Sequence, residues 1–191
     1  RIYVIAEVAQ AHDGSLGNAL AYAKTAKECG CNAVKYQIHI PSEESSLKEK
    51  FRIKGFPQDK TRYEYWERTS FTKKEWEIIR EYCSSIEIDF IVSTFSNKAV
   101  EWAQDLKIDA LKVGSGDVSN SLMLQKLSNE LDNNMPILIS SGMSNYKELD
   151  DAISILKENN RSKIIPMQCT SSYPTEPEEW GLNNINLLKE K

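Results

Sequence analysis

The sequence lacks the features that would place a protein in a membrane, in the secretory pathway or on nucleic acid. It contains no run of about 18 apolar residues and does not begin with a signal-like segment, so we expect neither a transmembrane helix nor a signal peptide. Basic residues are not in excess: the net charge is -4, with both signs mixed along the chain. We therefore expect a cytoplasmic protein whose partner is neither a membrane nor a nucleic acid.

Cysteine and histidine are scarce as well. The cysteines lie in unlike contexts, and Cys29 and Cys31 are too close to each other for a CxxC metal or redox pair. We expect these residues to be buried and reduced: Cys29, Cys31, Cys83 and Cys169. His12 and His39 have no third ligand near them in the sequence, so neither predicts a metal site.

The sequence does contain short apolar runs that alternate with segments of helical period. The runs are rich in Val and Ile, as expected for strands covered on both faces: Ile2–Val8, Ala33–Ile38, Phe90–Ser93, Ala110–Val113, Pro136–Ser140 and Lys163–Cys169. Helical stripes lie at 16–26, 100–106, 124–131, 149–156 and 182–188. Another helix should begin at Thr72, where Glu75 completes a capping box and Phe71 can pack on Trp76.

Strands that alternate with helices predict a parallel sheet built from βα units. With 191 residues and 40% apolar content, the chain can form one sizeable core. The pattern gives six βα units, more than a minimal doubly wound sheet and fewer than a complete eight-stranded barrel. We favour an α/β fold of the TIM (β/α)8 type, with only about the first six units in residues 1–191. An open doubly wound sheet is the alternative.

One connection, Pro41 to Ser70, is unlike the others. It is long and polar, with charges of both signs and scattered aromatic residues. Structureless loops of this length are usually functional lids or disordered segments. The aromatic residues favour a lid at 41–70, or a surface that packs against another subunit.

The stretch from Leu111 to Asn120 reads as an anion site. Lys112 lies in a buried strand, which is unfavourable unless an anion meets the charge. Ser115 follows between two glycines, where backbone N–H groups can approach an anion closely, and a helix begins beyond Asn120. This pattern is weaker than a P-loop and lacks the spacing of a dinucleotide fingerprint.

Polar residues collect at the carboxyl ends of the predicted strands, where parallel α/β folds place their active sites. They include Glu7, Gln10, His12 and Asp13-Gly14, then Lys35, Gln37 and His39, then Ser93-Thr94, Lys112, Ser115, Ser140-Ser141-Gly142 and Gln168–Pro174. Singly, a serine or threonine at a strand end is more often a turn or cap residue, and Asp-Gly is a turn signal. Lys35 and Lys112 are stronger candidates for ligand-binding residues, because two lysines in separate core strands need a shared anion or a carboxylate. Glu7 could be that carboxylate in a purely structural ion pair.

Taken in order, these motifs resemble one family. Ile5-Ala-Glu7 with Ala11-His-Asp-Gly14, then Ala33-Val-Lys-Tyr-Gln37, resembles the opening of the sialic acid synthase (N-acetylneuraminate synthase) family. The resemblance continues through Leu111–Asp117, Ile139–Met143 and Gln168–Pro174 and covers essentially the whole chain.

The resemblance implies a TIM-barrel transferase of carbohydrate biosynthesis. Such enzymes condense phosphoenolpyruvate with an N-acylated hexose, typically N-acetylmannosamine or its 6-phosphate, to a nine-carbon 2-keto sugar acid, with loss of phosphate by C–O cleavage. Matched position by position, phosphoenolpyruvate would be bound by Lys35, Thr94, Lys112, Ser115, Ser140 and Ser171. Glu7, Gln37 and Tyr173 would face the acceptor sugar, with Glu7 as the catalytic proton-transfer group.

The resemblance also implies parts that residues 1–191 do not contain. A divalent metal, manganese or magnesium, would polarise the acceptor aldehyde, and its histidine ligands would come from strands seven and eight. A C-terminal antifreeze-like (SAF) domain would reach across a homodimer with a sugar-binding arginine. We therefore expect a homodimer at full length, and no turnover by residues 1–191 alone.

Two other functions remain open. The chain could belong to a synthase of another nonulosonic acid, such as legionaminic or pseudaminic acid, or of a polysaccharide precursor. It could also be a non-catalytic, phosphosugar-binding barrel.

Overall fold

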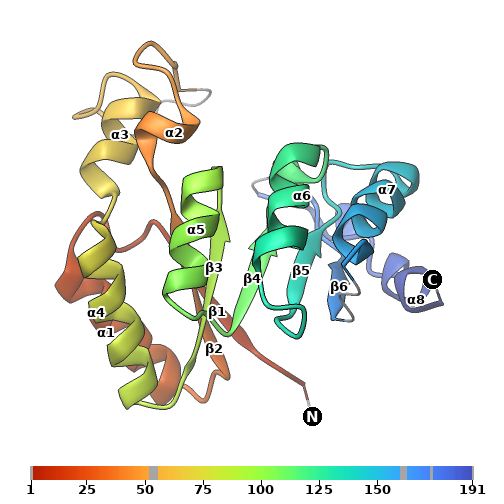
Figure 1. The fold of residues 1–191 in the computed structure, drawn as a ribbon, viewed down its shortest axis with the longest axis horizontal. Helices are drawn as coiled ribbons and strands as arrows, with labels where there is room; N and C mark the ends of the chain where they lie inside the picture. Colours follow the sequence, from red (N-terminus) through yellow and green to blue (C-terminus); the bar gives the residue numbers. More distant parts are fainter. Residues whose placement is uncertain (1, 52–55, 160–162, 173, 191) are drawn as a thin grey trace. The chain divides into compact units, whose positions relative to one another are not determined.

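The computed structural model describes residues 2–51, 56–159, 163–172 and 174–190 (Figure 1). The chain divides into two compact units, Arg1–Asp109 and Ala110–Lys191, and each is considered by itself. In both units, strands alternate with helices. Among the described residues, no helix is long and apolar enough to cross a membrane.

The first unit is a three-stranded parallel sheet with helices packed on it. Its elements are β1 (Ile5–Ala9), α1 (Leu16–Glu28), β2 (Ala33–Ile38), α2 (Pro41–Glu44), α3 (Arg62–Thr69), α4 (Lys73–Ser85), β3 (Asp89–Thr94) and α5 (Asn97–Asp105). Strand β2 lies between β1 and β3, with Glu7 beside Lys35 and Lys35 beside Ile91. Helices α1 and α4 pack side by side, as Figure 1 shows.

Local sequence signals explain why these elements form where they do. The predicted capping box at the start of α4 is present, because Thr72 and Glu75 each bond the other's backbone N–H. The rings of Phe71 and Trp76 lie edge to face, 5.1 Å apart, and Trp76 is almost fully buried. Strand β2 has the predicted bounds, and all of its residues except Gln37 are buried.

The second unit is another three-stranded parallel sheet. It contains β4 (Ala110–Val113), a 3-10 turn η1 (Ser115–Asp117), α6 (Ser121–Glu130), β5 (Ile137–Ser140), α7 (Tyr146–Lys157), β6 (Ile164–Met167), a 3-10 turn η2 (Pro177–Glu179) and α8 (Asn184–Glu190). Strand β5 lies between β4 and β6, with Lys112 beside Leu138 and Ser140 beside Met167. As predicted, α6 begins directly after Asn120, whose side chain caps it.

Two sequence-based expectations need correction. The apolar run at the N-terminal end is not a core strand throughout: β1 begins only at Ile5, and Ile2 is 84% exposed. Not every cysteine is buried: Cys83 is, whereas Cys29 is exposed and Cys31 and Cys169 are half-buried, although all are free thiols.

The described parts of the segment from 41 to 70, residues 41–51 and 56–70, contain two helices that the sequence did not indicate. Helix α2 begins on Pro41, and α3 is capped by Thr61. Arg68 of α3 forms ion pairs with Asp59 and with Asp13 of the turn after β1. A Cβ atom at Gly14 would lie 2.4 Å from the Arg68 carbonyl oxygen, so this glycine lets the turn pack closely against α3. Whether the segment acts as a lid stays a prediction.

Candidate functional site

In the first unit, the predicted site residues Glu7 and Lys35 lie beside each other in the middle of β1 and β2 and form an ion pair. The Lys35 Nζ lies 2.7 Å from Glu7 Oε2 and donates a hydrogen bond of 3.0 Å to Ser93 Oγ. The two partners differ in exposure, since the Lys35 side chain is 4% exposed and that of Glu7 is 44% exposed. Lys35 is thus neutralised from within the fold, while Glu7 keeps a surface that a ligand could reach.

Glu7 is held by an irregularity in its own strand. The β1–β2 register shifts between Glu7 and Ala9, and Ala9 has a φ of 48°, a conformation that residues with a side chain rarely adopt. In this conformation the Ala9 N–H donates to Glu7 Oε1 at 3.1 Å. Both carboxylate oxygens of Glu7 therefore have a fixed partner.

Gln37 is the last residue but one of β2, and Thr94 is the last residue of β3 in the same unit. The Thr94 hydroxyl is buried and has no hydrogen-bond partner among the described residues. The Gln10 amide nitrogen donates to the Gln37 carbonyl oxygen at 3.2 Å, while Gln10 Oε1 is buried and has no partner in the described ranges. The sequence had shown Gln10 at the strand end but gave no sign of this contact. Buried polar groups without partners are uncommon in folded proteins and suggest places where a ligand is bound.

Both histidines are held by contacts with other side chains and backbone groups of the first unit. His12 is fully buried, stacks on Phe71 and accepts a hydrogen bond from the Gly14 N–H at Nδ1. Burial lowers the pKa of His12 to about 4, since the charged form loses its water. His39 is stacked between Trp66 and Phe95 and lies 2.6 Å from a Glu44 carboxylate oxygen. Within the described ranges, no three His, Cys, Asp or Glu side chains come together in a way that could hold a metal ion. The residues described here therefore do not fit the expected divalent metal.

In the second unit, Lys112 is the contrasting lysine. It lies half-buried in β4 between Leu111 and Val113, both of which are fully buried. Within the described part of the chain, it has neither an ion-pair partner nor a side-chain hydrogen bond. On the neighbouring strand β5, the Ser140 hydroxyl is also buried without a partner among the described residues. A positive charge and a hydroxyl donor at strand ends are suited to an anion.

The other predicted anion ligands of this unit lie in the turns that follow the strands. Ser115 Oγ lies 3.4 Å from the thiol sulfur of Cys169, which follows β6. A Cβ atom at Gly142, in the turn after β5, would lie 2.8 Å from Ser171 Oγ and 3.0 Å from the Cys169 sulfur. Cys169 therefore contacts two turns of this unit, a role that its sequence context did not indicate.

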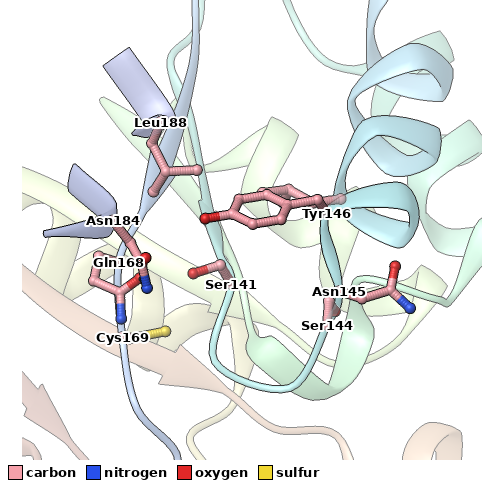
Figure 2. Close-up of a pocket in the computed structure, with 9 residues that line it drawn as sticks. Ser141, Ser144, Asn145, Tyr146, Gln168, Cys169, Asn184 and Leu188 are labelled. Carbon is pink, nitrogen blue, oxygen red and sulfur yellow. The ribbon is translucent and has the colours of Figure 1, made fainter. Parts of the chain in front are cut away.

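A cavity of about 340 Å³ lies beside Cys169. Figure 2 shows Gln168 and Cys169 on the segment after β6, with Ser141, Ser144 and Tyr146 across from them. The described residues that line the cavity carry hydroxyl and amide groups, and none of them is charged. Several of these groups already bond within the protein: Ser141 Oγ donates to the Met167 carbonyl, and Asn184 donates to Gln168.

The structure thus brings the predicted residues into two groups. Glu7, Lys35, Gln37 and Thr94 belong to the first unit, and Lys112, Ser115, Ser140 and Ser171 to the second. Tyr173 lies outside the described residues. That the two groups meet around one ligand stays a prediction.

Parallel βα units whose polar groups lie at the carboxyl ends of the strands define a class of α/β proteins that bind small molecules at that edge. Comparison with known proteins narrows this class. Residues 22–191 match the model of the NeuB family, and the chain belongs to that family.

Two curated relatives are synthases. The chain is 30% identical to N-acetylneuraminate-9-phosphate synthase of Drosophila melanogaster, over 98% of this chain and 50% of that protein. It is 33% identical to a pseudaminic acid synthase of Campylobacter jejuni, over 100% of this chain and 56% of that protein. The chain thus spans about half the length of these relatives.

The fold is shared with a solved structure. N-acetylneuraminic acid synthetase from Leptospira borgpetersenii, in complex with citrate, superimposes with a TM-score of 0.82 at 24% identity, over 99% of this chain and 61% of that one. The predicted fold class, the first six βα units of a TIM-type barrel, is confirmed by this likeness and by the strands of the described residues.

Proposed function

We propose that this chain is the phosphoenolpyruvate-binding part of a sialic acid synthase-type enzyme. The reaction joins phosphoenolpyruvate to an N-acylated hexose of the N-acetylmannosamine type and gives a nine-carbon 2-keto sugar acid and phosphate. Membership of the NeuB family and the synthase activities named for its relatives support this proposal.

The observation that carries the proposal is Lys112. A half-buried cation without a counter-ion is unfavourable, so such a lysine is expected where a ligand supplies the negative charge. Phosphoenolpyruvate carries a phosphate and a carboxylate. The hydroxyls of Ser115, Ser140 and Ser171, in the same unit, are suitable donors to their oxygens.

The first unit would contribute a second cation and the acid–base group. Lys35 and Thr94 would complete the phosphoenolpyruvate site, while Glu7 and Gln37 would face the acceptor sugar together with Tyr173. In the proposed reaction the enol carbon of phosphoenolpyruvate forms the new C–C bond to the acceptor aldehyde. The aldehyde oxygen takes up a proton, water adds to C2, and phosphate leaves with its bridging oxygen. Glu7 is positioned by Lys35 and the Ala9 N–H to move a proton.

Other parts of the proposal lie beyond this chain. A bound manganese or magnesium ion would polarise the acceptor aldehyde, held by residues that this chain does not contain. We also propose that the full-length protein works as a homodimer in the cytoplasm.

The Lys112→Ala variant of the full-length protein tests the site. We expect it to fold as the parent does but to lose the rise in melting temperature that phosphoenolpyruvate gives to the parent. Lys98→Ala, which removes an exposed lysine paired with Glu101, is the matched control and should keep the rise. A normal ligand-induced shift in Lys112→Ala would show that the assignment of Lys112 is wrong.

A panel of acceptors distinguishes the related functions. The parent protein is incubated with phosphoenolpyruvate and N-acetylmannosamine, its 6-phosphate, or the hexose precursors of pseudaminic and legionaminic acid, and phosphate release is followed. Release with one acceptor assigns the product. Binding of phosphoenolpyruvate without release in any mixture would instead favour the non-catalytic, phosphosugar-binding barrel.

A further inference from the structure

We propose that Cys169 is a positioning residue whose thiol orients the Ser115 hydroxyl toward the bound anion. The proposal rests on the proposed function, because it assigns a role within the phosphoenolpyruvate site. Cys169 would not touch the reacting atoms. It would act through Ser115.

The contact joins parts of the second unit that are far apart in sequence. Ser115 is the first residue of the 3-10 turn after β4, and Cys169 lies in the segment after β6, 54 positions later. The two side chains meet at 3.4 Å between oxygen and sulfur, a separation suited to a hydrogen bond that involves sulfur. Along the chain, the two turns are separated by α6, β5, α7 and β6, so this contact holds them together directly.

The thiol is also fixed from a second side. The turn after β5 lies so close that a Cβ atom at Gly142 would be 3.0 Å from the sulfur and 3.1 Å from the Cys169 carbonyl oxygen. The same turn is held to the end of β6, because Ser141 donates to the Met167 carbonyl oxygen from both its N–H and its hydroxyl. Cys169 thus has little freedom to turn away from Ser115.

The chemistry of a thiol suits this role. A thiol is a weak donor and a weak acceptor, whereas a serine hydroxyl has one proton to donate and can accept as well. If the Cys169 S–H donates to Ser115 Oγ, the Ser115 proton stays available for an anion oxygen. A strong acceptor at position 169 would compete with the ligand for that proton. The sulfur accepts only weakly, so it orients the Ser115 hydroxyl without competing for its proton.

Three variants of the full-length protein test this role by titration with phosphoenolpyruvate. Cys169→Ala removes the partner of Ser115, and we expect the dissociation constant to rise about three- to tenfold, the range for one net hydrogen bond. Cys169→Ser restores a donor, but its oxygen is a stronger acceptor than sulfur, so its affinity should lie between those of Cys169→Ala and the parent. Cys83→Ala is the matched control: it removes a fully buried thiol from α4 in the other unit and should lower the melting temperature without weakening binding.

A double-mutant cycle with Ser115→Ala separates positioning from general damage. If Cys169 acts through Ser115, adding Cys169→Ala to Ser115→Ala causes no further loss of affinity. Additive losses, or equal affinities of Cys169→Ala and Cys83→Ala, would overturn the positioning role while leaving the proposed function intact. Absence of phosphoenolpyruvate binding by the parent protein would instead overturn the proposed function, and this inference with it.

Discussion

Lys35 and Lys112 occupy similar positions in the two units but differ in their electrostatic surroundings. Each lies in the interior of a parallel strand between apolar neighbours. Lys35 has its counter-ion within the fold, 2.7 Å away on Glu7, and a serine hydroxyl as a second partner. Lys112 has neither among the residues that the structure describes.

The difference indicates what each lysine does in the absence of ligand. The Lys35–Glu7 pair holds β1 and β2 in place and fixes the carboxylate that the proposed reaction needs. Lys112 makes no such contact with the residues that the structure describes, so its charge is expected to raise the free energy of the empty site and to be offset when an anion binds. Residues that bind a ligand commonly lower the stability of the protein without ligand. The comparison therefore predicts opposite responses when the polar groups of the two units are removed.

The largest expected effect comes from the first unit, which contains both histidines of the chain. Burial lowers the pKa of His12 from 6.5 to about 4. In the unfolded chain, His12 is protonated below about pH 6.5, whereas in the folded protein it stays neutral down to about pH 4. Acid therefore favours unfolding. At about 1.4 kcal/mol per pKa unit, the first unit should lose roughly 3 kcal/mol of unfolding free energy across this window.

Hydrogen exchange of the first unit at pH 7, 5.5 and 4 measures this loss. In His12→Gln, the new side chain can still accept from the Gly14 N–H but does not titrate, so the stability of the variant should depend less steeply on pH. Its stability at pH 7 should be lower than that of the parent, because the stacked ring is lost. Equal pH slopes for the parent and His12→Gln would contradict the assignment to His12.

The next effect compares the two lysines directly, with methionine in place of each so that the apolar stem is kept. Lys35→Met leaves Glu7 without its cation, and we expect the unfolding free energy to fall by about 2 kcal/mol. This is less than for a fully buried pair, because water can reach the half-exposed carboxylate. Lys112→Met breaks no pair and should be neutral or stabilising by up to about 1 kcal/mol. Urea unfolding without ligand measures both, and a larger loss in Lys112→Met would reverse the comparison.

Much of the fold could be predicted because its signals are local. The Val- and Ile-rich runs locate the strands, and the Thr72–Glu75 capping box fixes the start of α4. The prediction of a core strand from Ile2 onward was wrong, because an apolar sequence alone does not show that Ile2 is 84% exposed. The helices in 41–70 were missed because α2 is only one turn long and α3 is rich in charge, so neither has a clear apolar stripe.

Candidate site residues could be named from the sequence, whereas their contacts could not. Strand periodicity and the family resemblance located Glu7, Lys35 and Lys112, because these depend on position along a strand. That Glu7 pairs with Lys35 was one of two open alternatives, and only the β1–β2 register shows it. The Ser115–Cys169 contact spans 54 positions, and no local pattern encodes a contact between two turns so far apart.

The smallest expected effect distinguishes two adjacent serines at the end of β5. The Ser140 hydroxyl is buried without a partner among the described residues, whereas that of Ser141 donates to the Met167 carbonyl at 2.9 Å. Removing an unsatisfied buried hydroxyl relieves a desolvation penalty, so Ser140→Ala should leave the empty protein as stable as the parent or up to about 1 kcal/mol more stable. Ser141→Ala loses a made hydrogen bond and should cost about 1 kcal/mol. Affinity for phosphoenolpyruvate should follow the reverse order, with the greater loss in Ser140→Ala, as titration of both variants would show. If Ser140→Ala were the less stable variant and bound phosphoenolpyruvate normally, its hydroxyl would serve the fold rather than the anion, and the second unit would resemble the first.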